Sequence, residues 1–327
     1  MASVPIGADR ARLPRRAWRF IERLRGGDEI AHVITLLCAA SIVVITLMLV
    51  YQLYIDSPLP RHKFGFSFFL GKTWDPVSGD FGALPFIYGT VVSSALALLI
   101  AVPLGVGAAI FLSELAPSRV SNITTFVIEL LAAVPSVIYG LLGIFILVPV
   151  LRKQVMPFLK ATLGFTPLFK GPIYGVSMLA GGVVLAIMIV PFIISVSREV
   201  LLAVPVEQRE AALGLGATKW ESTWQVVVPF ARVGIMASIF LALARALGET
   251  MAVTMVIGND PKINASLFAP AYSIAAVIAN EFTEATGDLY LQSLIELGLV
   301  LFLLTILING LARLVIIATT QKGASQG

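Results

Sequence analysis

Charged residues are scarce in this sequence of 327 residues. Lys, Arg, Asp and Glu together make up 13%, whereas hydrophobic residues make up 58% and the mean hydropathy is +0.93. A soluble domain carries about 25% charged residues. The scarcity excludes an ordinary soluble domain and predicts a chain that is solvated mainly by lipid.

Cysteine is almost absent, and the common motifs of catalysis and metal binding are missing. Cys38 is the single cysteine and lies in an apolar run, so no disulfide can form within the chain. The sequence has no HExxH motif, no nucleophile elbow and no cluster of Cys and His. We therefore expect no metal, no other cofactor and no enzymatic activity of the chain's own.

A phosphate-binding loop is also missing, although the segment FGFSFFLGKT (64–73) ends in Gly-Lys-Thr. Such a loop places four residues between its first glycine and the Gly-Lys pair, after a strand. Here five residues separate Gly65 from Gly71. We expect this segment to lie as an apolar loop on the membrane surface, and any ATP hydrolysis to require a separate chain.

Long apolar runs, in contrast, are abundant. Each is long enough to cross a hydrocarbon core of about 30 Å as a helix. The runs predict an all-α integral membrane protein whose transmembrane domain (30–319) has six transmembrane helices, at about 30–53, 86–113, 123–151, 173–197, 233–257 and 289–319. The first run is too long for a signal peptide and lacks a cleavage pattern of small residues, so we expect it to be retained.

The positive charges indicate the orientation of these spans. Residues 1–29 carry seven arginines. With the N-terminus in the cytoplasm, the cytoplasmic side collects fourteen Lys and Arg residues and the outer loops (54–85, 151–172 and 258–288) collect eight. This excess predicts that both termini, the loop 201–230 and the tail 320–327 are cytoplasmic. The net charge of +4 does not indicate nucleic acid, because no basic patch has interleaved aromatic residues.

Two ionisable residues lie deep in the fifth expected span. Arg245 is at the centre of 233–257 and Glu249 follows four residues later. On a continuous helix this spacing puts both on one face, where they could form an internal salt bridge. Alternatively, Arg245 is a permanent cation that contacts an anion on a translocation path.

Two more glutamates accompany expected spans. Glu129 precedes Pro135, which breaks the helical hydrogen bonding; Ser136, Tyr139 and Gly140 can satisfy the freed backbone groups. This kink either lines a cavity or simply fits neighbouring helices. Glu296 begins the last span, where a solvated or paired role is expected.

The loop 201–230 has the pattern of two short helices. Pro205 suits a helix start, Ala211 and Ala212 are small contact positions, and Gly216 supplies a turn. Thr218 and Glu221 have the spacing of a capping box, which would open a second helix to about Val228, with Pro229 ending it. A plain connection needs fewer residues, so we expect a docking element for another protein.

This loop resembles the cytoplasmic signature of ABC importer permeases. The signature is Glu-Ala-Ala, three residues, Gly, nine residues, then aliphatic-x-aliphatic-Pro; the matching residues here are Glu210, Ala211, Ala212, Gly216, Val226, Val228 and Pro229. The resemblance implies a type I importer fold, and a loop that couples the permease to an ATPase subunit through Glu210, Ala211, Ala212 and Gly216.

Further segments are similar to the inorganic phosphate permeases, and one part of them, GETMAV (248–253), is more similar to the PstC type than to the PstA type. These are WDPVSGDFGALPFIYGT (74–90), IFLSELAP (110–117), VPSVIYGLLGIF (134–145) and RALGETMAV (245–253). The resemblance implies a complex with a PstA-like permease, two PstB-like ATPases and a PstS-like phosphate-binding protein. It also implies that Arg245 and Glu249 take part in phosphate passage.

Other interpretations stay open on the sequence. Permeases for sulfate, molybdate or phosphonate share the coupling signature. A secondary transporter could use Glu129 or Glu249 as a proton relay, and a membrane scaffold subunit would leave Arg245 without a role.

Overall fold

The structure, a computed structural model, describes the backbone of residues 28–324 and the side chains of 31–314. The side chains of the Arg-rich segment expected at 1–29 and of the tail expected at 320–327 lie outside these residues. Six described helices are long and apolar enough to cross a membrane, which confirms the expected number. They are α2 (Asp28–Ile55), α5 (Leu84–Ile110) with η1 (Phe111–Leu115), the run from α7 to α9 (Ser136–Leu163), α10 (Met178–Leu202), the run from α12 to α13 (Lys219–Leu247), and α16 (Asp288–Ala324).

The chain divides into two compact units, 1–52 and 53–327. In the first, α2 is an apolar helix of 28 residues with a mean hydropathy of 2.8 over its spanning part. At 1.5 Å per residue it is about 42 Å long, enough to cross a bilayer core. All contacts described below lie within the second unit.

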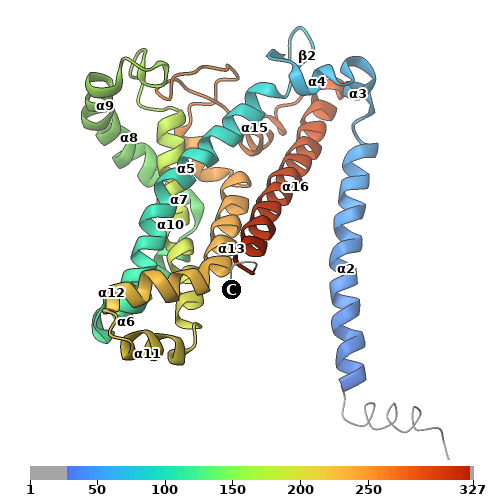
Figure 1. Cartoon of the computed structure of the whole chain (residues 1–327). Helices are drawn as coiled ribbons and strands as arrows, with labels where there is room; N and C mark the ends of the chain where they lie inside the picture. Colours follow the sequence, from blue (N-terminus) through green and yellow to red (C-terminus); the bar gives the residue numbers. More distant parts are fainter. Residues whose placement is uncertain (1–27, 325–327) are drawn as a thin grey trace, which may run out of the picture. The chain divides into compact units, whose positions relative to one another are not determined.

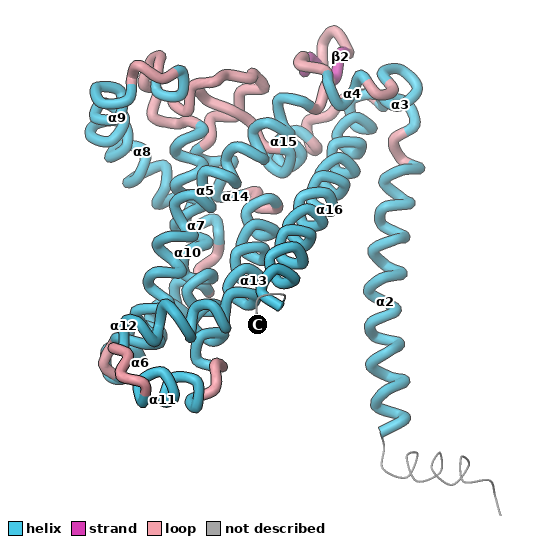
Figure 2. Tube along the Cα trace, in the orientation of Figure 1, coloured by secondary structure: helices cyan, strands magenta, loops and turns pink. Residues whose placement is uncertain are grey.

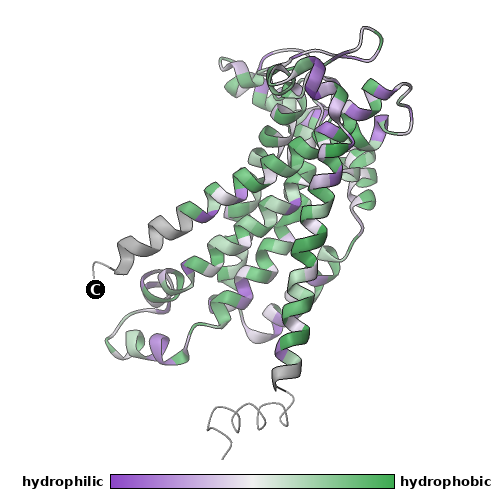
Figure 3. Ribbon diagram, turned by 90° about the vertical axis from the view of Figure 1, so that its right-hand side faces the viewer, coloured by the Kyte–Doolittle hydropathy of each residue, from purple (hydrophilic) through white to green (hydrophobic). Residues whose placement is uncertain are grey.

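Short elements gather at the two ends of the second unit (Figures 1 and 2). One end, here called the cap end, holds α3 (Pro58–Phe64), α4 (Ser67–Leu70), the hairpin of β1 (Trp74–Asp75) and β2 (Asp80–Phe81), and α15 (Ile274–Glu281). The other, the loop end, holds α6 (Ser118–Ala132), α11 (Val206–Gly214) and α12 (Lys219–Ser222). Figure 3 shows hydrophobic residues along the long helices and many hydrophilic residues at their ends.

The core is built around α10, the most buried of the six spans, which packs along α5. Close approach of these helices depends on glycine. A Cβ atom placed on Gly105 of α5 would lie 2.7 Å from Cγ2 of Ile193 on α10, which is closer than van der Waals contact allows. Small residues at such crossings let helix backbones pack tightly in membranes.

This packing predicts opposite outcomes for two glycines of α5. We expect Gly105→Leu to destabilise the chain by about 1–3 kcal/mol through overpacking. Gly107→Leu is the matched control, because a Cβ there meets no heavy atom within 4 Å. Thermal unfolding in detergent measures both; equal melting temperatures for the two variants would contradict the α5–α10 contact.

Within residues 28–324, four π turns precede prolines. In each, the residue before the proline donates its backbone N–H to the carbonyl five residues back: Ala116 to Phe111, Val148 to Gly143, Met156 to Leu151, and Val228 to Thr223. A proline in a regular α-helix has no donor and clashes with the carbonyl four residues back. The wider π turn relieves that clash, so three of these helices continue past their proline.

One consequence corrects a sequence prediction. The expected helix end at Pro229 is wrong, because η5 (Thr223–Val227) joins α12 to α13 (Val228–Leu247) without a break. The second helix of the loop is therefore the start of a membrane span.

The expected third span, 123–151, is also placed differently. The chain breaks at 133–135, so α6 is a separate helix and the span runs over Ser136–Leu163. The break follows from Pro135, which precedes α7 (Ser136–Leu142). As expected for Tyr139, its hydroxyl donates to a freed carbonyl, that of Leu131, at 2.6 Å. Helix α9 (Met156–Leu163) thus occupies part of the expected loop 151–172.

An aromatic cluster holds the cap end together. The Trp74 ring packs edge to face on Phe81 and Phe86, with ring centroids 4.8 and 4.9 Å apart. The Glu281 carboxylate accepts hydrogen bonds from Trp74 Nε1 at 2.8 Å and from Tyr290 Oη at 2.7 Å. Burial, with the Glu281 carboxylate adding to it, raises the pKa of the nearby Tyr272 to about 12.

Two sequence predictions, for the segment 64–73 and for Glu296, concern residues of the cap end. The segment 64–73 is not simply a surface loop, because Phe68 is buried in the aromatic core while Phe66 is 89% exposed. Glu296 of α16 is buried and lies 3.6 Å from Nε of Arg61 on α3, so the expected paired role is confirmed.

Candidate functional site: a coupling loop and a broken helix

The four expected coupling residues lie together on one loop. Glu210, Ala211 and Ala212 are in α11, which Pro205 precedes as N-cap. Gly216 turns the chain with φ +91°, a conformation that residues with a side chain rarely adopt. Leu215 and Ala217 donate back to α11, at 3.2 Å to the carbonyl of Ala211 and 3.1 Å to that of Ala212.

The turn leads into the second helix through a capping box. The Thr218 hydroxyl accepts from the backbone N–H of Glu221 at 3.3 Å, and the Glu221 carboxylate accepts from the backbone N–H of Thr218 at 2.8 Å. The predicted box is therefore confirmed. A hollow of about 350 Å³ lies between α11 and the α12–η5 run, lined by Gln208, Ala211, Ala212, Leu215, Ala217, Glu221, Ser222, Gln225 and Val226.

Large apolar side chains are exposed around this loop. Leu215 is 91% exposed, and Trp220 and Trp224 pack edge to face with centroids 5.5 Å apart while each remains about half exposed. Glu210 is exposed as well. A group of exposed aromatic and aliphatic residues is typical of a surface that contacts another protein or a membrane.

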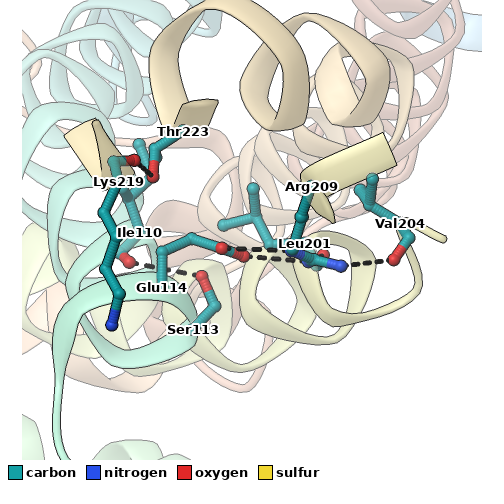
Figure 4. Close-up of polar contacts among 8 residues, drawn as sticks. All are labelled: Ile110, Ser113, Glu114, Leu201, Val204, Arg209, Lys219 and Thr223. Atoms are coloured by element: carbon teal, nitrogen blue, oxygen red, sulfur yellow. Dashed lines mark hydrogen bonds and ion pairs between the residues drawn. The ribbon is translucent and has the colours of Figure 1, made fainter. Parts of the chain in front are cut away.

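One arginine attaches α11 to the ends of two membrane spans. Arg209 Nη2 lies 2.9 Å from Oε1 of Glu114, and Nε lies 3.2 Å from Oε2, which gives a bidentate ion pair with η1 (Figure 4). The same guanidinium donates to the carbonyls of Leu201 and Val204, at 2.7 and 2.5 Å, at the end of α10. No sequence motif points to a role for Arg209 or Glu114.

The fifth expected span, 233–257, is interrupted where its charged residues lie. Helix α13 ends at Leu247, Gly248 follows as its C-cap, and α14 (Met251–Val256) begins three residues later. Arg245 is therefore in the last turn of α13, where the helix dipole favours a cation. Its side chain is exposed in this chain, with the guanidinium carbon 6.0 Å from the ring centroid of Phe192 on α10.

The interruption changes the expected relation between Arg245 and Glu249. The Glu249 carboxylate accepts from the backbone N–H of Ala252 at 3.2 Å and so caps α14. Within the described residues no ion pair joins Arg245 to Glu249. The i,i+4 salt bridge, one of the two interpretations of this pair, is therefore absent, since Glu249 lies beyond the end of the helix that carries Arg245.

The comparison with known proteins agrees with this architecture. The family model described as "Binding-protein-dependent transport system inner membrane component" matches residues 101–317. The chain is 49% identical over 297 residues to the "Phosphate transport system permease protein PstC" of Mesorhizobium japonicum, covering 90% of this chain and 91% of that protein. The protein of the same name from Haemophilus influenzae is 46% identical over 291 residues, with 88% and 92% covered.

Solved structures support the fold. A crystal structure of a bacterial alginate ABC transporter, in complex with a pentasaccharide-bound periplasmic protein, aligns with a TM-score of 0.57 at 14% identity, over 89% of this chain and 96% of that chain. With six apolar helices and a type I permease architecture, this is a multi-pass membrane protein. The chain belongs to the family of binding-protein-dependent transport system inner membrane components, in the branch formed by the permeases named PstC.

Proposed function

We propose that this chain is a transmembrane permease subunit of an ATP-driven importer for inorganic phosphate. The names of the relatives support phosphate as the substrate. The two relatives that align with about nine-tenths of this chain are both named phosphate transport system permease proteins. The observation that carries the coupling role is the loop end, where Glu210 of α11 and Leu215 just after it are exposed, while Arg209 hydrogen-bonds α11 to the ends of two spans.

The proposed complex contains a PstA-like second permease, two PstB-like ATPases and a PstS-like phosphate-binding protein. In it, the N-terminus, the C-terminus and α11 face the cytoplasm of a bacterial inner membrane, in keeping with the positive charge at 1–29. The α11 loop, with Glu210, Ala211, Ala212 and Gly216, seats in a groove of one ATPase. ATP hydrolysis occurs in that partner, and this chain forms half of the translocation pathway.

Arg245 is the residue proposed to meet phosphate. An arginine keeps its charge in low dielectric, and its planar donors match an oxyanion. In this conformation Glu249 is held by Ala252, so its carboxylate does not neutralise the guanidinium. A single cationic contact attracts the anion without retaining it, which transport requires. Glu249 contributes by stabilising the start of α14 after the helix break. When phosphate is protonated, the Glu249 carboxylate also accepts a hydrogen bond from the phosphate hydroxyl.

The selectivity of the complex tests this proposal against other oxyanion importers. We expect the purified complex in nanodiscs to hydrolyse ATP faster when its binding protein is loaded with phosphate. Equal stimulation by sulfate, molybdate or a phosphonate on the corresponding binding proteins would reassign the substrate. ATP hydrolysis that no loaded binding protein changes would contradict the importer itself.

The alternative to an ATP-driven importer is a secondary transporter, which is driven by the proton gradient. It would use Glu129 or Glu249 as a proton relay and would not need α11 to be exposed. Such a protein would accumulate phosphate without ATP, and would lose that accumulation when the proton gradient collapses.

A further inference from the structure

Helix α11 has little of its own to hold it in place. It has nine residues, and isolated helices of that length are not stable in water. Ala212 is its one buried residue, and its main packing partners are α12 and η5 of the same loop. This packing connects α11 to the span that α12 and η5 begin, whereas its connection to the ends of α5 and α10 comes from polar contacts.

Arg209 supplies that connection with one side chain. The guanidinium plane forms two parallel hydrogen bonds with Glu114, a geometry that resists rotation as well as separation. Its remaining donors reach the carbonyls of Leu201, in the last turn of α10, and of Val204, two residues beyond the end of that helix. Figure 4 shows the arginine between η1 and the end of α10.

The burial of this contact makes it stiff. The side chains of Arg209 and Glu114 are 19% and 10% exposed, so water and salt screen the pair less than they screen a surface ion pair. Glu114 lies in the π turn η1, a type of helix distortion that is frequent at functional sites. The elements joined are the ends of α5 and α10, the two spans that pack together in the core.

We propose that Arg209 and Glu114 form the joint that transmits movement of α11 to the membrane spans. When an ATPase displaces α11, the guanidinium carries the displacement to α5 through Glu114 and to α10 through the two carbonyls. This inference rests on the proposed function, since it needs an ATPase that moves the loop. Arg209 is a positioning residue: it touches no substrate and acts by keeping α11 aligned with the spans.

The test is the number of phosphate ions transported per ATP hydrolysed, measured on the whole complex in proteoliposomes. We expect Arg209→Gln to lower this ratio at least about tenfold, while the ATPases still co-purify and still hydrolyse ATP. Arg209→Lys keeps the charge but cannot form the bidentate contact, and we expect an intermediate ratio. Arg119→Gln is the control, because Arg119 is an exposed arginine of the neighbouring α6.

Further variants keep the test decisive. Glu114→Gln removes the ion pair but leaves the hydrogen bonds from Arg209 to the carbonyls of Leu201 and Val204. The same ratio is measured for this variant, and it decides the test if the complex with Arg209→Gln does not assemble. We expect the double variant to lose no more than Arg209→Gln alone, because that single variant already removes the contact with Glu114. An unchanged ratio in Glu114→Gln, or additive losses in the double variant, would overturn the joint. If the wild-type complex transports no phosphate with ATP, the proposed function fails instead.

Discussion

Replacing Arg245 by Gln is expected to lower phosphate uptake about 10- to 100-fold in cells that express and assemble the complex normally. A hydrogen bond between a charged group and its partner contributes about 1.5–3 kcal/mol, and each 1.4 kcal/mol is a factor of ten. Arg245 is exposed beside the break in the fifth span, with no carboxylate paired to it in the described chain. Its loss therefore removes a cation that nothing nearby replaces.

Two companion variants separate charge from general damage. Arg245→Lys keeps the positive charge, so we expect it to retain more uptake than Arg245→Gln. Arg232→Gln makes the same change on the same helix, at an exposed position near its start, and should leave uptake near the wild-type level. Wild-type uptake by Arg245→Gln would remove this residue from the path of phosphate.

Changing Leu215 to Gln is expected to release the ATPase subunit from the complex. Leu215 is 91% exposed, so the folded chain alone should tolerate the change. When the loop is seated in a partner, burial of such a side chain contributes about 1.5–3 kcal/mol. We therefore expect the ATPase to bind about 10- to 100-fold more weakly, measured by titrating it onto the purified permease.

Leu70 provides the matched control for the loop. It is 72% exposed on α4 at the cap end, and Leu70→Gln should leave ATPase binding unchanged. If Leu215→Gln binds the ATPase as tightly as the wild type, the loop end does not dock in the way proposed. A loss of binding in both variants would point instead to general misfolding.

Local patterns predicted the parts of the loop that depend on neighbours in sequence. The turn at Gly216 and the capping box of Thr218 and Glu221 were predictable because each is set by backbone geometry within four residues. The six spans were predictable because lipid imposes a minimum apolar length on each.

The misplaced boundaries have one physical cause. Hydropathy does not report whether a proline breaks a helix or is absorbed by a π turn. Pro135 ends one helix and begins another, whereas Pro229 follows η5 in an unbroken run. The outcome depends on contacts such as that between Tyr139 and the carbonyl of Leu131, which link residues eight apart.

The joint of Arg209 and Glu114 could not be predicted by spacing. Its partners are 95 residues apart, and each is an ordinary charge near the end of a span. Only the packing of α5 along α10 brings them together. For Arg245 and Glu249 the reverse holds. Their spacing of four residues allows a salt bridge on a continuous helix, but the break at Gly248 separates the two residues.

The central claim is that this chain passes phosphate under the control of ATP hydrolysis in a partner. Phosphate accumulation by proteoliposomes tests it most directly, with the complete complex, ATP inside, loaded binding protein outside and a proton ionophore present. We predict accumulation of radiolabelled phosphate that requires hydrolysable ATP and is unaffected by the ionophore. Accumulation that occurs without ATP, or that the ionophore abolishes, would contradict the claim.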